Sequence, residues 1–375
     1  MWIKAAASLL TLALQTKRAG PVFASVMNLK VKVIAAALLA GLLLTGCAPE
    51  ESFPVPDVSG LESPVTLVRY DRALSALDTA DLAAAVATLE DRYPVFTDVY
   101  LTDILPLRRR LSDPEEQLLA LRAFFAYPLV REIDSLVSAR FTDADLAEQT
   151  ARLEQALRYY RHYLPNAPRP DTLVTFYSQF EVAAALYGNG DLAAGLEFFL
   201  GPDYDYQRVS ARDPIFSAYL ARSYTPDHLT GKLMRVVIDD FVDPPRGGKL
   251  IDHLIYEGKK RFLLERVLPG VPAHVVHEVS PEQQAWLAEN EIAIYAHLQK
   301  EKHLYATDPV LIRKYTQPAP SSQGMPAESP GQAVNFLGQR IVEAYVRNNP
   351  GVDMAALLAE TDGQRILAGA RYKPR

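Results

Sequence analysis

An uninterrupted apolar run that stops just before the chain's single cysteine limits how much of this sequence can take part in a fold. The 12 residues of 33–44 are all apolar or glycine, lysines precede them, and Thr45, Gly46 and Cys47 follow. This run is too short to cross about 30 Å of hydrocarbon, which takes roughly 20 residues. A short apolar run behind a basic start is typical of a cleaved signal peptide. We therefore assign residues 1–46 to a signal peptide region, with Met27 as the expected start.

The residues around the cysteine resemble the lipobox of bacterial lipoproteins. Small residues, Thr45 and Gly46, stand directly before Cys47. The resemblance implies that Cys47 becomes the first residue of the mature protein, carries a fatty acid such as palmitate and anchors the chain in the bacterial cell envelope. Ala48 resembles the residue found in lipoproteins released to the outer membrane. Because no second cysteine exists, an intramolecular disulfide is excluded.

The composition after Cys47 predicts a solvated tether and then an acidic globular domain. Residues 47–65 are rich in proline, serine and glycine, and a flexible segment of this length reaches about 20–25 Å. Without residues 1–46 the chain has 34 basic and 45 acidic residues, a formal net charge of −11. Binding to nucleic acid depends on lysine and arginine. We therefore expect no nucleic-acid partner.

Apolar spacing predicts a mainly α fold with a small β-hairpin or sheet, an α+β domain over residues 66–375. Residues 66–170 form its helical N-terminal part, as the spacing of Leu82, Val86 and Leu89 indicates. β-Formers on both sides of the turn sequence Gly188–Asp191 predict a strand and a β-hairpin within residues 173–200. Helical spacing returns in Thr230–Asp243, Lys249–Leu268, Pro281–Leu304, Ala333–Asn348 and Asp353–Gly369. Residues 316–332 are rich in proline and are either a loop or a mobile flap.

Several short motifs, taken in order and spacing, resemble the gliding-motility lipoproteins of the GldB type. They are Phe199–Tyr204, Tyr256–Lys260, Ser280–Pro281 with Gln283, Trp286 and Asn290–Glu291, Ser329–Gly331 with Gly338 and Ile341–Val342, and Ile366–Leu367 with Tyr372–Pro374. The similarity covers the chain from about Arg69 to its end. It implies a lipoprotein of the bacterial envelope that takes part in gliding motility or a related envelope process.

The element order from residue 171 onward also resembles, distantly, the zinc metallopeptidases of the HExxH class. Their chemistry requires two histidines one helical turn apart, beside a glutamate that takes a proton from zinc-bound water. The corresponding segment, Val236–Asp243, has no histidine. Glu257 resembles the third ligand, left without its partners. The resemblance therefore implies a zincin-like scaffold lacking metal ligands, a pseudo-peptidase.

Two interpretations of the remaining acidic residues stay open. The spacing of Asp239 with Asp243, and of His253 with Glu257, is i, i+4 and could build a carboxylate-rich metal site. Alternatively, Asp239, Asp240 and Asp243 are the solvated end of a helix, and Glu257 pairs with a cation on its own helix. We favour the second interpretation and treat these five residues as a vestigial site.

The sequence therefore predicts a binding protein and no enzyme. It contains no G-x-S-x-G elbow, phosphate-binding loop or dinucleotide fingerprint. We expect no catalytic residue, no cofactor and no metal. The expected function is a lipid-anchored component of the gliding or envelope machinery that binds a protein partner. The alternative is a metal-dependent, peptidase-like hydrolase with an unorthodox carboxylate-rich site.

Overall fold

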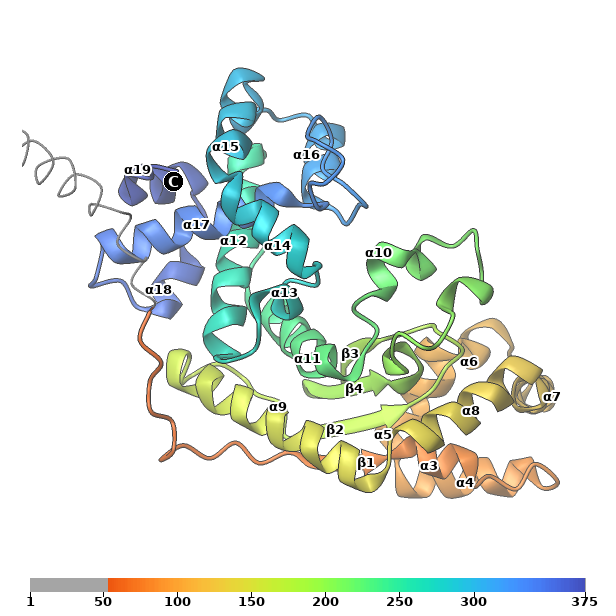
Figure 1. The fold of residues 1–375 in the computed structure, drawn as a ribbon. Coiled ribbons are helices and arrows are strands. Elements are labelled where there is room, and N and C mark those ends of the chain that lie inside the picture. The colour runs from red at the N-terminus through yellow and green to blue at the C-terminus, as the bar shows by residue number, and fades with distance from the viewer. Residues whose placement is uncertain (1–52, 375) are drawn as a thin grey trace, which may run out of the picture. The chain divides into compact units, whose positions relative to one another are not determined.

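A four-stranded mixed sheet lies between two groups of helices in the computed structural model, which describes residues 53–374 (Figure 1). The strands are β1 (Thr66–Arg69), β2 (Thr172–Phe176), β3 (Ala184–Tyr187) and β4 (Asp191–Gly195), in the order β1-β2-β4-β3. β2 pairs in parallel with β1 and β4, whereas β3 and β4 are antiparallel. The signal peptide region and Cys47 lie outside the described residues.

The predicted hairpin is confirmed by the pairing of β3 with β4. Tyr187 is paired with Asp191, and the turn between them contains Gly188 and Gly190, both with positive φ (55° and 101°). A side chain would strain these two positions, which is why glycine suits them.

The prediction that the sheet lies within residues 173–200 was wrong in one respect, because β1 lies outside that range. β1 has only four residues and pairs with a strand more than 100 residues later. Such a short strand has too few residues to show a clear alternation.

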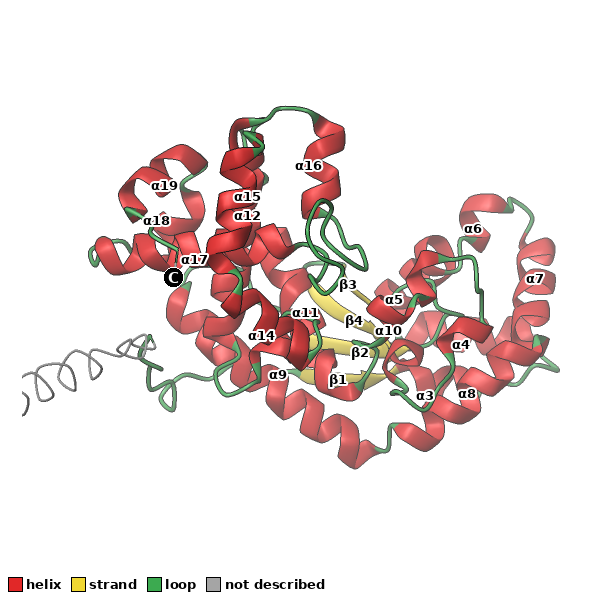
Figure 2. Ribbon diagram, turned by 45° about the horizontal axis from the view of Figure 1, so that its top comes forward, coloured by secondary structure: helices red, strands yellow, loops and turns green. Residues whose placement is uncertain are grey.

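The helices before β2 gather at one end of the sheet, apart from α9, which runs beside it (Figures 1 and 2). They are α3 (Tyr70–Ser75), α4 (Leu82–Arg92), α5 (Pro94–Val99), α6 (Leu107–Arg110), α7 (Pro114–Ala126), α8 (Pro128–Arg140) and α9 (Asp143–Tyr163), with a π-helical turn at Tyr100–Ile104. Proline begins α5, α7 and α8, where its missing N–H costs no hydrogen bond. The chain between β1 and β2 is therefore mostly helical.

Helices after the sheet make up most of the remaining chain. They are α10 (Ala218–Ala221), α11 (Pro226–Phe241), α12 (Leu250–Val267), α13 (Ala273–Val276), α14 (Pro281–Glu289), α15 (Glu291–Lys300), α16 (Pro309–Thr316), α17 (Ala333–Asn348), α18 (Met354–Ala359) and α19 (Gly363–Ala370). Short 3-10 helices occupy Leu196–Phe199, Tyr206–Arg208, Pro214–Phe216 and His303–Tyr305. The mainly α fold class with a small sheet is confirmed.

Four details of these helices differ from the prediction. The helix expected over 281–304 is divided at Asn290, and the helix expected over 353–369 is divided at residues 360–362. α16 occupies a segment to which no helix was assigned. α11 ends at Phe241, so Asp243 lies beyond the helix and not one turn after Asp239.

α12 and α17 cross in direct backbone contact. A Cβ atom added to Gly258 would lie 2.3 Å from the carbonyl carbon of Gly338, and one added to Gly338 would lie 2.0 Å from the carbonyl oxygen of Leu254. Real Cβ contacts are longer than this, so each helix needs glycine at the crossing. The close approach sets the position of α12 relative to α17 and to the loop that leads into α17.

We expect Gly258→Ala to lower the free energy of unfolding by about 1–3 kcal/mol, because the new methyl group forces two packed backbones apart. Urea denaturation of the purified protein measures the effect. Gly351→Ala is the matched control, since a Cβ there meets no atom within 4 Å, and it should change stability by less than about 0.5 kcal/mol. Equal effects of the two substitutions would contradict the tight crossing.

A fully buried carboxyl group holds the chain segment that follows β2. Glu197 Oε1 accepts hydrogen bonds from the backbone N–H groups of Ser178 (2.7 Å) and Phe180 (3.0 Å) and from the Ser178 hydroxyl (2.9 Å). Gln179 and Phe180 both have φ of 67°, a conformation that side chains disfavour. Burial raises the pKa of Glu197 to about 7, although these hydrogen bonds oppose the shift.

This raised pKa predicts that the protein loses stability as the pH rises from about 4.5, the ordinary value, through about 7. The folded state holds the proton more tightly than the unfolded chain, so ionisation favours unfolding. Glu197→Gln keeps an acceptor oxygen and cannot ionise. Between pH 5 and pH 8 the wild type should lose about 1–3 kcal/mol relative to this variant in urea denaturation. Parallel pH profiles would refute the buried, titrating carboxyl.

Candidate functional site

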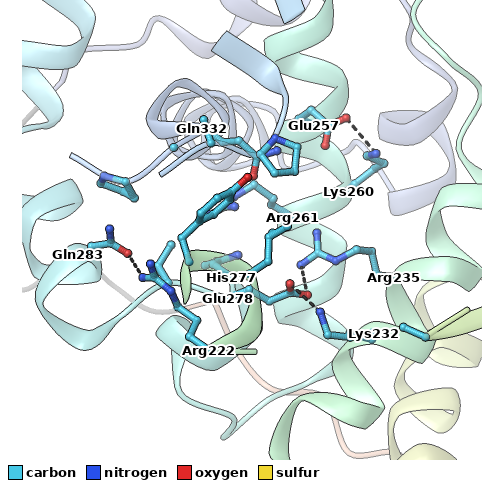
Figure 3. A pocket seen from close by; sticks show the side chains of 18 of the residues that line it. Arg222, Lys232, Arg235, Glu257, Lys260, Arg261, His277, Glu278, Gln283 and Gln332 are labelled. Atoms are coloured by element: carbon cyan, nitrogen blue, oxygen red, sulfur yellow. Dashed lines mark hydrogen bonds and ion pairs between the residues drawn. The ribbon is translucent and has the colours of Figure 1, made fainter. Parts of the chain in front are cut away.

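A cavity of about 400 Å³ opens beside β3 and is lined by residues of α11, α12, the α13–α14 connection and the loop before α17 (Figure 3). Its lining is strongly charged. The charged side chains are Arg222, Lys232, Arg235, Asp239, Glu257, Lys260, Arg261 and Glu278. We call this cavity the charged pocket. It contains five cationic and three acidic side chains.

α11 contributes one charged face to the charged pocket, because Lys232, Arg235 and Asp239 follow one another at helical spacing. Lys232 Nζ lies 2.8 Å and Arg235 Nη2 lies 3.4 Å from the carboxylate of Glu278. Burial opposes the ionisation of Glu278, but the two cations outweigh it and lower the pKa of this carboxyl to about 2. Glu278 is therefore a charged acceptor that holds the connection between α13 and α14 against α11.

Lys260 links the two acidic residues of the charged pocket. Its ammonium group lies 2.9 Å from Asp239 Oδ1 and 3.0 Å from Glu257 Oε1. It also lies 4.3 Å from the centre of the Tyr256 ring. Burial lowers the pKa of Lys260, and the two carboxylates more than restore it, so the side chain stays charged. The expected pairing of Glu257 with a cation on its own helix is confirmed.

The structure brings together only two of the five residues predicted for a vestigial site. Asp239 and Glu257 line the charged pocket, where Lys260 lies between them. Asp240 and Asp243 are exposed near the end of α11, and half-buried His253 lies on α12 outside the pocket lining. Within residues 53–374, no three His, Cys, Asp or Glu side chains lie close enough to hold a metal ion.

Arg261 is a buried cation without a salt bridge to any described carboxylate. Its residue surface is only 7% exposed, and its Nε donates to Gln339 Oε1 at 3.4 Å. Burial, helped by the nearby charge of Arg235, lowers the pKa of this guanidinium to about 10. Arg261 therefore remains charged at neutral pH. The carboxylates of Glu265, Glu257 and Glu278 oppose this lowering of the pKa, although none of the three forms a salt bridge with Arg261. A buried charge without a direct partner of opposite charge is energetically costly.

His277 is buried beside Arg261 and keeps one ring nitrogen unsatisfied. Its Nε2 lies 2.6 Å from Glu265 Oε1, and its buried Nδ1 has no hydrogen-bond partner among the described residues. Burial lowers the pKa of His277 to about 4, so the ring is neutral at pH 7. Since Glu265 needs a donor, Nε2 carries the proton and Nδ1 is an acceptor.

Arg222 completes the cationic side of the charged pocket. It donates to Gln283 Oε1, which also accepts from the backbone N–H of Ser280. Ser280 and Gln283 form a capping box at the start of α14. Burial lowers the pKa of Arg222, and no described carboxylate forms a salt bridge with it.

The proline-rich segment between α16 and α17 is a loop that forms one wall of the charged pocket. Ser322 Oγ donates to the Pro330 carbonyl (2.8 Å) and accepts from the Ala333 N–H (3.0 Å). A Cβ added to Gly331 would lie 1.9 Å from the carbonyl oxygen of Ala319. These contacts fold the loop back on itself and present Pro318–Pro320 and Pro330–Gln332 to the cavity.

Sequence reasoning missed most of the cationic lining. The spacing of Lys232, Arg235 and Asp239 is a usable signal, because it places three charges on one face of an amphipathic helix. Arg222 and His277 gave no such signal, since each depends on contacts with a distant part of the chain. Arg261 lies in α12, and the apolar pattern of this helix does not reveal that the Arg261 side chain is buried.

A protein-family model described as gliding motility protein GldB matches residues 51–374 of the chain. The chain belongs to the GldB family. The match covers the sheet, the charged pocket and the motifs that suggested the resemblance. No curated protein and no solved structure matches significantly.

GldB-family membership supports an envelope lipoprotein associated with gliding motility. In the part of the chain that the structure describes, no helix is both long and apolar enough to cross a membrane.

For this GldB-family chain we expect Glu257→Gln to cost about 1 kcal/mol of folding stability, because one of the two carboxylates on partly buried Lys260 is lost. Glu289→Gln, exposed on α14, is the control and should have little effect. We expect no proteolysis that depends on Glu257. Peptide hydrolysis by the purified wild type that both a chelator and Glu257→Gln abolish would contradict this interpretation.

Proposed function

We propose that this protein is a lipid-anchored, non-catalytic component of the gliding machinery that binds a protein partner through the charged pocket. Membership of the GldB family supports the link to gliding motility. The lipobox at Cys47 supports a lipid anchor, and Ala48 supports the outer membrane as its location. The proposal places the folded domain on a tether beside the membrane, where it meets partners of the envelope.

The observation that carries the proposal is the placement of Lys260 between Asp239 and Glu257. If the scaffold is related to the zinc peptidases, an ammonium group lies where acidic ligands would otherwise face a metal. With this cation in place, the two carboxylates need no metal ion to balance their charge. The same pocket contains buried Arg261, with which no described carboxylate forms a salt bridge, and this favours recognition of an acidic group over hydrolysis.

Lipidation makes a direct prediction. Acylation requires the thiol of Cys47, so Cys47→Ser should abolish labelling by a fatty-acid analogue and leave the protein unprocessed or released from membranes. Metabolic labelling of cells that express each form measures this. Labelling that persists in Cys47→Ser would contradict the assignment of the anchor.

Partner binding is tested by affinity capture of the lipidated protein from cross-linked envelopes. We expect gliding or secretion components to be recovered with the wild type and reduced severalfold with Arg222→Ala, which changes a half-buried residue of the charged pocket. Arg110→Ala, an exposed residue outside the pocket, is the matched control and should behave as the wild type.

Two results would overturn the proposed function. The first is recovery of the same partners at the same level with Arg222→Ala, which would place the binding surface elsewhere. The second is stoichiometric metal that survives dialysis together with chelator-sensitive hydrolysis, which would favour the alternative, a metal-dependent hydrolase.

A further inference from the structure

We propose that the charged pocket binds the free carboxyl-terminal end of an extended peptide, with the terminal carboxylate on Arg261 and the peptide backbone along β3. This inference rests on the proposed function, because it names the part of the partner that enters the pocket. The proposed ligand is a chain end, because a chain end has both an anionic group and a neighbouring amide N–H.

The buried guanidinium of Arg261 gives the first reason to expect an anionic ligand. The residue is 7% exposed and faces the charged pocket, yet none of the described carboxylates forms a salt bridge with it. Glu265, Glu257 and Glu278 act on it electrostatically without such a contact. A guanidinium group presents parallel N–H donors that match the two oxygens of a carboxylate. Arg222 also faces the cavity, and none of the described carboxylates forms a salt bridge with it. The pocket therefore has two cations available for an incoming anion.

Two unsatisfied polar atoms belong to residues that line the same pocket, and they give the second reason. His277 Nδ1 and Arg235 Nε are both buried without a hydrogen-bond partner among the described residues, and His277 is 6% exposed. Neutral His277 offers an acceptor, whereas Arg235 offers a donor. A peptide end supplies both complements, since its last amide N–H donates and its carboxylate accepts. An anion without a proton to donate, such as chloride or sulfate, would leave the histidine acceptor unpaired.

An edge strand of the sheet forms part of the pocket wall, and this gives the third reason. β3 is the last strand of the sheet among the described residues, and Ala183 and Ala184 line the charged pocket. The Ala183 carbonyl accepts from the Gly195 N–H on β4 (3.0 Å). Since the backbone groups of an antiparallel strand alternate in direction, those of Ala184 point to the open edge. An extended peptide can pair with such an edge as an added strand.

The size of the cavity limits how much of the peptide enters. About 400 Å³ is near the lower end of ligand pockets, which run from about 300 to 1,000 Å³. Pro318 and Pro320 line the cavity and supply no backbone N–H. The pocket therefore suits the last few residues of a chain better than an internal segment, which would have to enter and leave.

The test uses the purified protein and random octapeptides displayed with free carboxyl termini. Selected peptides are synthesised as the free acid, as the carboxyl-terminal amide, and with N-methyl groups at alternate backbone amides. Binding is measured by fluorescence anisotropy. We expect the free acid to bind at least about tenfold more tightly than the amide, and N-methylation in one of the two alternating registers to weaken binding.

Variants assign the carboxylate to its partner. Arg261→Gln should weaken binding of the free acid about thirtyfold or more, the usual result of removing one partner of a buried charge pair, and should remove the preference for acid over amide. If Arg261→Gln does not fold, as judged by circular dichroism, Arg222→Gln provides the same comparison at the pocket rim. Arg110→Gln is the matched control and should bind as the wild type.

Three results would overturn the inference: no peptide is selected, acid and amide bind equally, or folded Arg261→Gln keeps full affinity and preference. Binding that follows an acidic side chain and survives amidation would also overturn it. The proposed function would still hold in each case if envelope capture is reduced by Arg222→Ala. If capture is not reduced by that substitution, the proposed function is wrong, and peptide binding can still be measured separately.

Discussion

The backbone contact between α12 and α17 at Gly258 and Gly338 is the constraint on which the charged pocket depends. Neither glycine accepts even a methyl group without displacement of the other helix. The contact places α12 beside the start of α17, and so brings the loop that contains Pro330 and Gly331 over the charged face of α12. A wider crossing would move this wall of the pocket away from Lys260 and Arg261.

The motif Tyr256–Lys260 shows how one short segment serves several contacts. Gly258 makes the helix crossing, and the Tyr256 ring lies beneath the ammonium of Lys260. Lys259 is buried and donates to the carbonyl oxygens of Leu358 (2.8 Å) and Glu360 (2.7 Å), which end α18. Since a helix turns 100° per residue, five successive residues reach all sides of α12. The segment therefore links the pocket to the C-terminal helices.

Electrostatics divides the charged pocket into a paired part and an unpaired part. Glu278 balances Lys232 and Arg235, and Lys260 balances Asp239 and Glu257. These pairs fix the positions of α11, α12 and the α13–α14 connection relative to one another. Arg261 and Arg222 form no salt bridge with a described carboxylate. The ion-paired residues hold the surrounding elements in place, and these two arginines are available to bind a ligand.

The sequence by itself determined features that depend on neighbouring residues. The glycines at 188 and 190 predict the hairpin, and the period of apolar residues predicts α4, α12 and α17. Family motifs carried the resemblance, which the family model confirms. Each of these is a property of a local backbone conformation or of a short stretch of chain, and so it can be read without knowing the fold.

Only the tertiary structure decided which charges meet. β1 joined the sheet through a partner more than 100 residues away, and α11 ended before Asp243, which separated that residue from Asp239. Lys232 and Glu278 are 46 residues apart and form a pair, whereas Asp239 and Glu257 meet only through Lys260. Apolar spacing records which face of a helix is buried. It does not record which other helix covers that face, and this is decided by packing over the whole chain.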